Sequence, residues 1–228
     1  MAALTAAFEA ARDPARAAAM AAYIRGQFPF FGIPSAGRAV IERAITSAHP
    51  PPESARELAG IVIRCWVGPE REYQYFGVAY LRRQMALATP DLVPTVRRLI
   101  TTKSWWDTVD ELATHVVGPL VSAYPELRAT IDEWIGSDDL WLARTAILHQ
   151  ERYRERTDPD LLFAYCLRRA ADRDFFIRKA IGWALRTYAK TNPRAVETFL
   201  GRHGDALSGL SRREAQKGLA LARRKATH

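Results

Sequence analysis

Apolar residues recur at three- and four-residue intervals along most of the chain, whereas strict two-residue alternation over the length of a strand is hard to find. This spacing is typical of amphipathic helices. The pattern therefore predicts an all-α protein. Prolines, glycines and capping side chains mark where the helices begin and end. The first helix ends near Arg25, and later helices are predicted at about 36–48, 53–67, 70–88, 91–101, 106–117, 125–135, 140–152, 159–171, 175–191, 193–201 and 212–224.

Two of these helix starts are marked by a pair of adjacent residues. Asp158 precedes Pro159, and Asn192 precedes Pro193. Each pair places a side-chain hydrogen-bond acceptor at the cap and a proline at the first helical position. We therefore expect helices to begin at both points.

Short stretches of the chain resemble each other at a fixed interval. Residues 142–147 (LARTAI) match residues 176–181 (FIRKAI) at a shift of 34 residues, and residues 76–81 lie about two such shifts upstream. A two-helix unit that repeats every 30–40 residues is typical of an α-solenoid of the HEAT or armadillo kind. We predict an α-solenoid of HEAT-like helix pairs with a concave face, as a single domain over residues 1–228. An irregular helical bundle is the alternative.

The charge of the chain is concentrated near its end. The 228 residues carry 33 basic and 25 acidic side chains. Residues 178–228 hold twelve of the basic and three of the acidic ones, so the rest of the chain sums to −1. Such an asymmetry is expected of a surface that binds a phosphate backbone, although solvated helix faces and basic tails give the same counts. We predict a cationic concave groove.

Four of these basic residues share one predicted helix, namely Arg178, Lys179, Arg186 and Lys190. They cannot all point to one side of it, so about half of them would meet phosphate.

The remaining composition limits the chemistry. Cys65 and Cys166 are too few for a disulfide scaffold or a Cys-based zinc site, and we expect them to be buried. The five histidines, of which His228 is the last, lack metal-ligand spacing, so we expect no metal and no other cofactor. The N-terminal segment lacks the apolar core of a signal peptide, and no run of eighteen apolar residues occurs. These features predict a reduced, cytoplasmic protein with no membrane contact.

One segment, residues 103–110 (KSWWDTVD), departs from the composition of a core helix. Trp106 and Asp110 are four residues apart and therefore share a helix face, which would present an aromatic ring beside a carboxylate. The structural alternative is a packed tryptophan beside a solvated acid. Ser104 is a candidate N-cap, with Asp107 closing a variant of the capping box.

Other polar and aromatic residues have ordinary structural explanations. The charged residues Glu70, Arg71 and Glu72 are interpreted as a solvated helix face. Tyr23 can simply pack against the nearby phenylalanines. In contrast, Arg144 and Trp183 fall on the second helix of predicted pairs, and in a solenoid such residues converge on the concave face.

Several segments of the chain resemble a known family. The strings KSWWDTVD, WLARTAI, FFIRKAIGWALRTYAKTNP and QFPFFGI are similar to those of the AlkD-type DNA alkylation-repair glycosylases, which are built of HEAT-like repeats. Matching segments extend from about Tyr23 to the C-terminal LSRREA. The resemblance implies a monofunctional glycosylase of base excision repair that hydrolyses the N-glycosidic bond of N3- or N7-alkylated purines in duplex DNA. It also implies a monomer in a bacterial-type cytosol, associated with nucleoid DNA when bound.

Carried over by position, the resemblance assigns roles to single residues. Trp106 and Asp110 would form the active-site pair, Trp183 the second ring, Arg144 a DNA contact and Tyr23 a groove residue. Lys103 is explained by phosphate contact, so no lysine beside the site is a strong candidate for a Schiff base. The Ala-rich segment before Tyr23 matches no motif.

Two other functions fit the same fold class. One is a catalytically silent paralogue that binds branched or damaged DNA, and the other is a scaffold that binds a protein on its concave face. The aspartate favours the enzyme, because a carboxylate in an otherwise cationic groove repels phosphate and would have no purpose in a scaffold.

Overall fold

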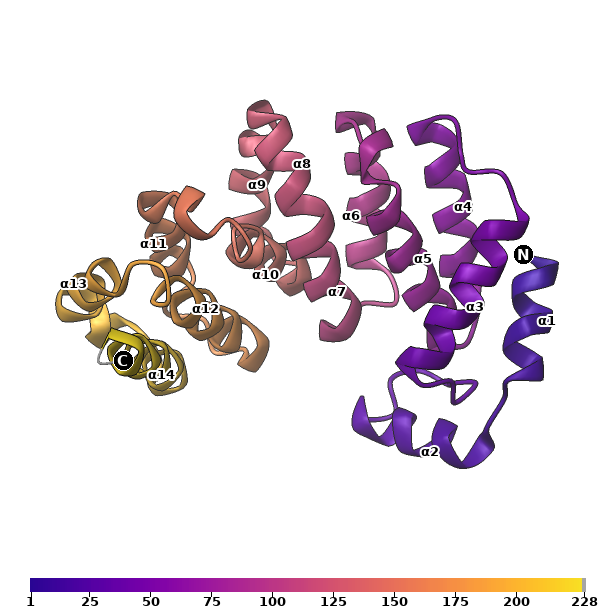
Figure 1. Ribbon diagram of the computed structural model, residues 1–228. Helices are drawn as coiled ribbons and strands as arrows, with labels where there is room; N and C mark the ends of the chain where they lie inside the picture. The colour runs from indigo at the N-terminus through magenta and orange to yellow at the C-terminus, as the bar shows by residue number, and fades with distance from the viewer. Residues whose placement is uncertain (227–228) are drawn as a thin grey trace. The chain divides into compact units, whose positions relative to one another are not determined.

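The computed structural model describes residues 1–226 of the chain (Figure 1). Helices and short loops make up these residues, and no strand occurs among them, so the all-α prediction is confirmed. His228 lies outside the described residues. The chain divides into two compact units, Met1–Thr108 and Val109–His228. The prediction of a single domain stays a prediction.

The first unit is built around α4 and α5. Helix α5 packs on α4 and α3, while α1 packs on α3 and α6 on α4. Large apolar side chains such as Phe8, Leu58 and Ile100 are fully buried in its core. Its helices are α1 (Ala2–Ala10), α2 (Pro14–Tyr23), α3 (Ser35–Ala48), α4 (Ala55–Val67), α5 (Arg71–Arg83), α6 (Val93–Thr101) and the start of α7 (Trp106–Leu112), with short 3-10 turns at Met85–Leu87 and Pro90–Leu92.

The second unit has two layers of helices. After the end of α7 come a π-helical turn at Ala113–Val117, α8 (Gly118–Ala123), α9 (Arg128–Ile135), α10 (Leu140–Leu148), α11 (Pro159–Arg168), α12 (Phe175–Tyr188), α13 (Pro193–His203) and α14 (Gly209–Ala226), with 3-10 turns at Pro125–Leu127, Arg154–Arg156 and Gly204–Ala206. In one layer α12 packs between α10 and α14, and in the other α11 packs on α13 (Figure 1).

This layering confirms the predicted repeat. The two matching strings lie on α10 and α12, which pack against each other as the second helices of successive pairs do in a solenoid. The predicted caps are confirmed as well. Asp158 accepts a hydrogen bond from the backbone N–H of Leu161, and Asn192 accepts one from that of Ala195.

The N-terminal segment forms two helices where the sequence pattern predicted one that ends near Arg25. Helix α1 stops at Ala10, and α2 starts at Pro14 with the Asp13 carboxylate accepting from the backbone N–H of Arg16. Proline fixes its own backbone and lacks an N–H, so it starts a helix more readily than it continues one. The Asp13-Pro14 pair is the same start signal as Asp158-Pro159.

The predicted helix at 106–117 also differs from the structure. Helix α7 ends at Leu112 and continues as the π-helical turn into α8. Pro119 cannot donate to the carbonyl of His115 and would clash with it, and a wider turn relieves both problems. Gly118 allows a close approach here, because a Cβ atom at that position would lie 2.3 Å from the carbonyl oxygen of His149.

Within residues 1–226, no helix combines the length and apolar character that a membrane crossing requires.

Candidate functional site

The carboxylate of Asp110 is held by an arginine fork within the second unit. The Nε of Arg144 on α10 donates to Asp110 Oδ1 at 2.6 Å, and its Nη2 donates to Oδ2 at 2.8 Å. The two residues are only 9% and 3% exposed. Two parallel charge-assisted hydrogen bonds fix both the position and the plane of a carboxylate. Asp110 is therefore an oriented group and not a solvated surface acid.

Each guanidinium nitrogen of Arg144 donates a hydrogen bond within the protein. Its Nη1 donates to the carbonyl oxygen of Phe176 on α12, and its guanidinium carbon lies 5.9 Å from the centroid of the Phe176 ring. The sequence predicted a DNA contact for Arg144. That role stays a prediction, and the geometry adds a different one, which is to orient Asp110.

Trp106 and Tyr23 meet at the edge of the first unit. Trp106 is the first residue of α7 and is half-buried, while Tyr23, the last residue of α2, is 74% exposed. Their ring centroids are 5.9 Å apart with an interplanar angle of 72°. This edge-to-face contact is a favourable one for aromatic rings. Tyr23 thus projects from the surface beside Trp106, and the alternative that it packs among the phenylalanines is wrong.

The ammonium of Lys103 contacts the end of α4. Its Nζ donates to the carbonyl oxygens of Val67, at 3.3 Å, and of Gly68. Burial, together with the charge of Arg71, lowers the pKa of Lys103. A cation at this position stabilises the negative end of the helix dipole. These contacts account for Lys103 without a phosphate, and its predicted DNA contact stays a prediction.

Trp183, Arg178, Lys179 and Arg186 lie on α12, whereas Lys190 comes two residues after the end of this helix at Tyr188. The indole of Trp183 is half-buried. Arg178 donates through Nε to the carbonyl oxygen of Asp172 at 2.9 Å, whereas Lys190 is exposed. The basic residues therefore differ in what they contact, and which of them meet phosphate stays a prediction.

Lys179 and Arg186 are engaged by an acidic residue that the sequence analysis did not single out. Glu214 on α14, with 3% of its side chain exposed, pairs with Lys179 at 3.0 Å, with Lys217 at 2.9 Å and with Arg186. These hydrogen bonds, that of Lys217 above all, lower the pKa of Glu214 to about 2. Gly182 permits the approach, because a Cβ atom there would lie 2.6 Å from the Cβ of Glu214.

The interpretation of Arg71 and Glu72 as a solvated face is wrong, because both side chains are completely buried. The Glu72 carboxylate accepts from the backbone N–H groups of Phe31, Gly32 and Ile33 at 2.9–3.0 Å. It thereby fixes the QFPFFGI loop onto α5. Three backbone donors offset the cost of burying a charge, and sequence spacing gave no sign of this contact forty residues away.

The predicted capping box is also wrong. The Oγ of Ser104 donates to the carbonyl oxygen of Ile100, and the Asp107 carboxylate pairs with the guanidinium of Arg71 at 2.5 Å. The Asp107 side chain is 8% exposed. Asp107 is thus a partner of a distant helix, and not of the residue three positions before it.

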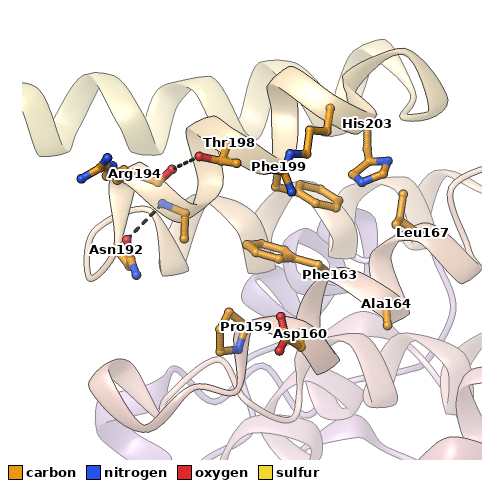
Figure 2. A pocket seen from close by; sticks show the side chains of 12 residues that line it. Pro159, Asp160, Phe163, Ala164, Leu167, Asn192, Arg194, Thr198, Phe199 and His203 are labelled. Atoms are coloured by element: carbon orange, nitrogen blue, oxygen red, sulfur yellow. Dashed lines mark hydrogen bonds between the residues drawn. The ribbon is translucent and has the colours of Figure 1, made fainter.

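A hollow of about 650 Å³ lies between α11 and α13 in the second unit (Figure 2). The rings of Phe163 and Phe199 stack in it with centroids 4.4 Å apart, and Arg194 and His203 also line it. None of the predicted site residues lines this hollow. It is therefore separate from the residues of α10 and α12 described above.

Nothing in residues 1–226 gathers three or more histidine, cysteine, aspartate or glutamate side chains in a way that could hold a metal ion. Cys65 and Cys166 are buried, as expected, and burial raises the pKa of each thiol. Burial likewise lowers the pKa of His149 to about 4, and its Nδ1 lies 2.7 Å from the carbonyl oxygen of Ala146. These groups are explained as parts of the core.

Comparisons with known proteins agree on one class. The sequence profile of the family described as DNA alkylation repair enzyme matches residues 4–219. A solved structure described as a predicted DNA alkylation repair enzyme from Enterococcus faecalis is 31% identical, with a TM-score of 0.82 over 90% of this chain and 95% of that one. The protein belongs to the DNA alkylation repair enzyme family, and the resemblance found in the sequence is confirmed.

A second solved structure shares the fold at lower identity. The protein smu.31 from Streptococcus mutans UA159 is 17% identical, with a TM-score of 0.55 over 81% of this chain and 89% of that one. A comparison with curated proteins finds no match.

Proposed function

We propose that this protein is a monofunctional DNA glycosylase that hydrolyses the N-glycosidic bond of N3- or N7-alkylated purines in duplex DNA. Family membership makes alkylation repair the general role and DNA the partner. One observation carries the finer proposal. Asp110 on α7 is buried, and Arg144 on α10 orients its carboxylate. Trp106, the first residue of α7, contacts the exposed ring of Tyr23.

The chemistry of the substrate suits these groups. An alkyl group at N3 or N7 makes the purine cationic, so the base is already a good leaving group and needs little general acid catalysis. The enzyme must stabilise positive charge instead. A tryptophan ring can contribute about 0.5–2 kcal/mol by a cation–π interaction, and we assign this role to Trp106 and Trp183.

Asp110 supplies the negative charge. As the bond breaks, positive charge grows on the sugar, and a fixed carboxylate stabilises it or orients the attacking water. The fork from Arg144 supports this role because it holds the carboxylate plane before the substrate arrives. A charge that is already in place costs no reorganisation in the transition state.

The proposal includes no cleavage of the DNA strand by the protein itself. A lyase needs a free amine that forms a Schiff base with the sugar. The Nζ of Lys103 instead contacts the carbonyls of Val67 and Gly68. Sodium borohydride should therefore trap no covalent protein–DNA adduct, whereas a trapped adduct would contradict the monofunctional assignment.

The duplex is proposed to lie along a cationic concave groove, with part of the basic set on α12 and just after it contacting phosphate. We propose that the protein works as a monomer in the cytoplasm without a cofactor.

The test is release of free base from a duplex that carries a single N7-methylguanine, followed by heat cleavage at the abasic product. The wild type should release the base, and Asp110→Asn should slow release by about 10²–10³-fold. Asp132→Asn is the matched control, because Asp132 is another carboxylate of the second unit that accepts a hydrogen bond, from Tyr165.

Two results would contradict the proposal. No release with tight, salt-sensitive duplex binding would favour a DNA-binding paralogue without catalysis. No release and no duplex binding would favour a protein-binding scaffold.

A further inference from the structure

A second buried arginine fork lies in the first unit and holds the backbone on both sides of Trp106. Arg71, at the start of α5, has no exposed surface. Its Nε donates to Asp107 Oδ2 at 3.1 Å and its Nη2 donates to Oδ1 at 2.5 Å. The same Nη2 donates to Thr108 Oγ1 at 2.8 Å. Arg71 is thereby fixed to the first turn of α7.

The fork also holds the loop that leads into this helix. Arg71 Nη1 donates to the carbonyl oxygen of Lys103 at 2.8 Å. Lys103 has a φ of 50°, in the left-handed region that a side chain disfavours. A conformation of this kind persists only where the surroundings hold it. The Lys103 carbonyl and the Asp107 carboxylate flank Trp105 and Trp106, so one guanidinium fixes the chain before and after the two rings.

Tyr75 and Phe28 complete the enclosure of this fork. The hydroxyl of Tyr75 donates to Asp107 Oδ2 at 2.6 Å. Burial, together with the charge of Asp107, raises the pKa of Tyr75, so the phenol keeps its proton and remains a donor. The guanidinium carbon of Arg71 lies 4.2 Å from the centroid of the Phe28 ring. The Arg71 guanidinium, the Asp107 carboxylate and the Tyr75 hydroxyl thus each contact another group of the protein.

We propose that Arg71, Asp107 and Tyr75 are positioning residues that set the orientation of the Trp106 ring toward the damaged base. This inference rests on the proposed function, because it assumes that Trp106 contacts the base. The three residues are not catalytic residues, since the buried fork and its carboxylate face protein groups. They act through the backbone of residues 103–108, which sets where Trp106 meets Tyr23.

The sharpest test compares two tyrosines of the same chemistry. Tyr75 donates to Asp107 in the first unit, and Tyr165 donates to Asp132 in the second unit. Tyr75→Phe and Tyr165→Phe each remove one hydroxyl that bonds a carboxylate. Only the former should affect Trp106, so Tyr165→Phe controls for the general loss of a partly buried tyrosine–aspartate hydrogen bond.

Two measurements follow each variant. The first is the single-turnover rate of base release at saturating protein, together with the Kd for the duplex. We expect Tyr75→Phe and Asp107→Asn to slow release by about 10-fold or more while Kd changes far less, because misplacement by about 1 Å can cost 10²-fold. Tyr165→Phe should leave both quantities nearly unchanged.

The second measurement does not depend on activity. The indole N–H resonance of Trp106, assigned by its loss in Trp106→Phe, should shift or broaden in Tyr75→Phe and stay in place in Tyr165→Phe. An unchanged resonance and rate in Tyr75→Phe would overturn the inference, as would equal effects of the two tyrosine variants. If Asp107→Asn fails to fold, Tyr75→Phe still decides the question.

The two proposals fail in different ways. A wild type that releases no base, with a resonance that still responds to Tyr75→Phe, would refute the glycosylase and leave the fixation of Trp106 intact. A wild type that releases base, with no response to Tyr75→Phe, would refute the positioning role alone.

Discussion

Helix α7 carries two aspartate–arginine pairs that differ in what the arginine holds. In the first unit, Asp107 accepts hydrogen bonds from Arg71 Nε and Nη2, the Tyr75 hydroxyl and the Thr108 backbone N–H. In the second unit, Asp110 accepts two hydrogen bonds from the fork of Arg144. Both carboxylates are nearly buried, at 8% and 12% side-chain exposure. The same ion pair can therefore fasten a backbone turn in one unit and orient a carboxylate in the other.

The largest expected effect is the loss of folding stability when either aspartate–arginine pair is broken. Arg144→Met and Arg71→Met each leave a buried carboxylate without its cation, which should lower the free energy of unfolding by about 3–5 kcal/mol. The double variants Asp110→Leu/Arg144→Met and Asp107→Leu/Arg71→Met should regain most of the lost free energy of unfolding, because neither leaves an unpaired charge of the pair buried. Urea denaturation measures all four.

The activities of the double variants then separate the two pairs. Removing Asp110 should slow base release by at least about 10²–10³-fold in a folded protein, whereas removing Asp107 should slow it less. Single variants that cost less than about 1 kcal/mol would show that the pairs are not as buried as the structure has them.

A third carboxylate, Glu214, sharpens the comparison because it gathers three cations. Its pKa is lowered from 4.5 to about 2 in the folded protein. A depressed carboxyl pKa adds stability that is fully present above the unfolded value and is lost as the pH falls from about 4.5 to about 2. The loss should approach about 3 kcal/mol.

The check is urea denaturation between pH 2 and 7 for the wild type and Glu214→Gln. The variant should be less stable at neutral pH and should show a flatter profile below pH 4.5. Parallel profiles for the two proteins would refute the role of Glu214.

The smallest expected effect is a change in how strongly the affinity for duplex DNA depends on salt concentration. Lys190 is exposed and has no ion pair within the described part of the chain, whereas Lys179 pairs with Glu214. If Lys190 contacts phosphate, Lys190→Ala should reduce the slope of log affinity against log salt by about 1. Lys179→Ala should reduce it less, because this cation is already neutralised in part. Equal slopes for wild type and Lys190→Ala would remove Lys190 from the interface.

Much of the fold could be predicted because helical periodicity and caps are local. The apolar spacing, the caps at Asp158 and Asn192 and the 34-residue repeat identified the helices and the stacking of α10 on α12. The predicted helix bounds were wrong where a proline interrupts a helix although the apolar spacing continues through it. Pro14 split the first helix, and Pro119 accompanies the π-helical turn.

Only part of the candidate site's contacts could be predicted from the sequence. Sequence motifs indicated Trp106, Asp110, Trp183 and Tyr23 through a family resemblance. They gave no indication that Arg71 is buried or that Glu214 clamps Lys179, because neither contact is marked by spacing. Arg71 lies 36 residues from Asp107, and Glu214 lies 35 residues from Lys179. The sequence around a charged residue does not distinguish one that faces water from one that is paired with a distant side chain.

The sequence by itself determined that this protein is a stack of helices of the DNA alkylation repair family, because periodicity, capping and motif identity are written in neighbouring residues. The tertiary structure alone decided which charges are free and which are paired. A charge can be buried at little cost only when another group of the protein bonds it, and packing decides which group that is. Arg71 on Asp107 and Arg144 on Asp110 are such choices.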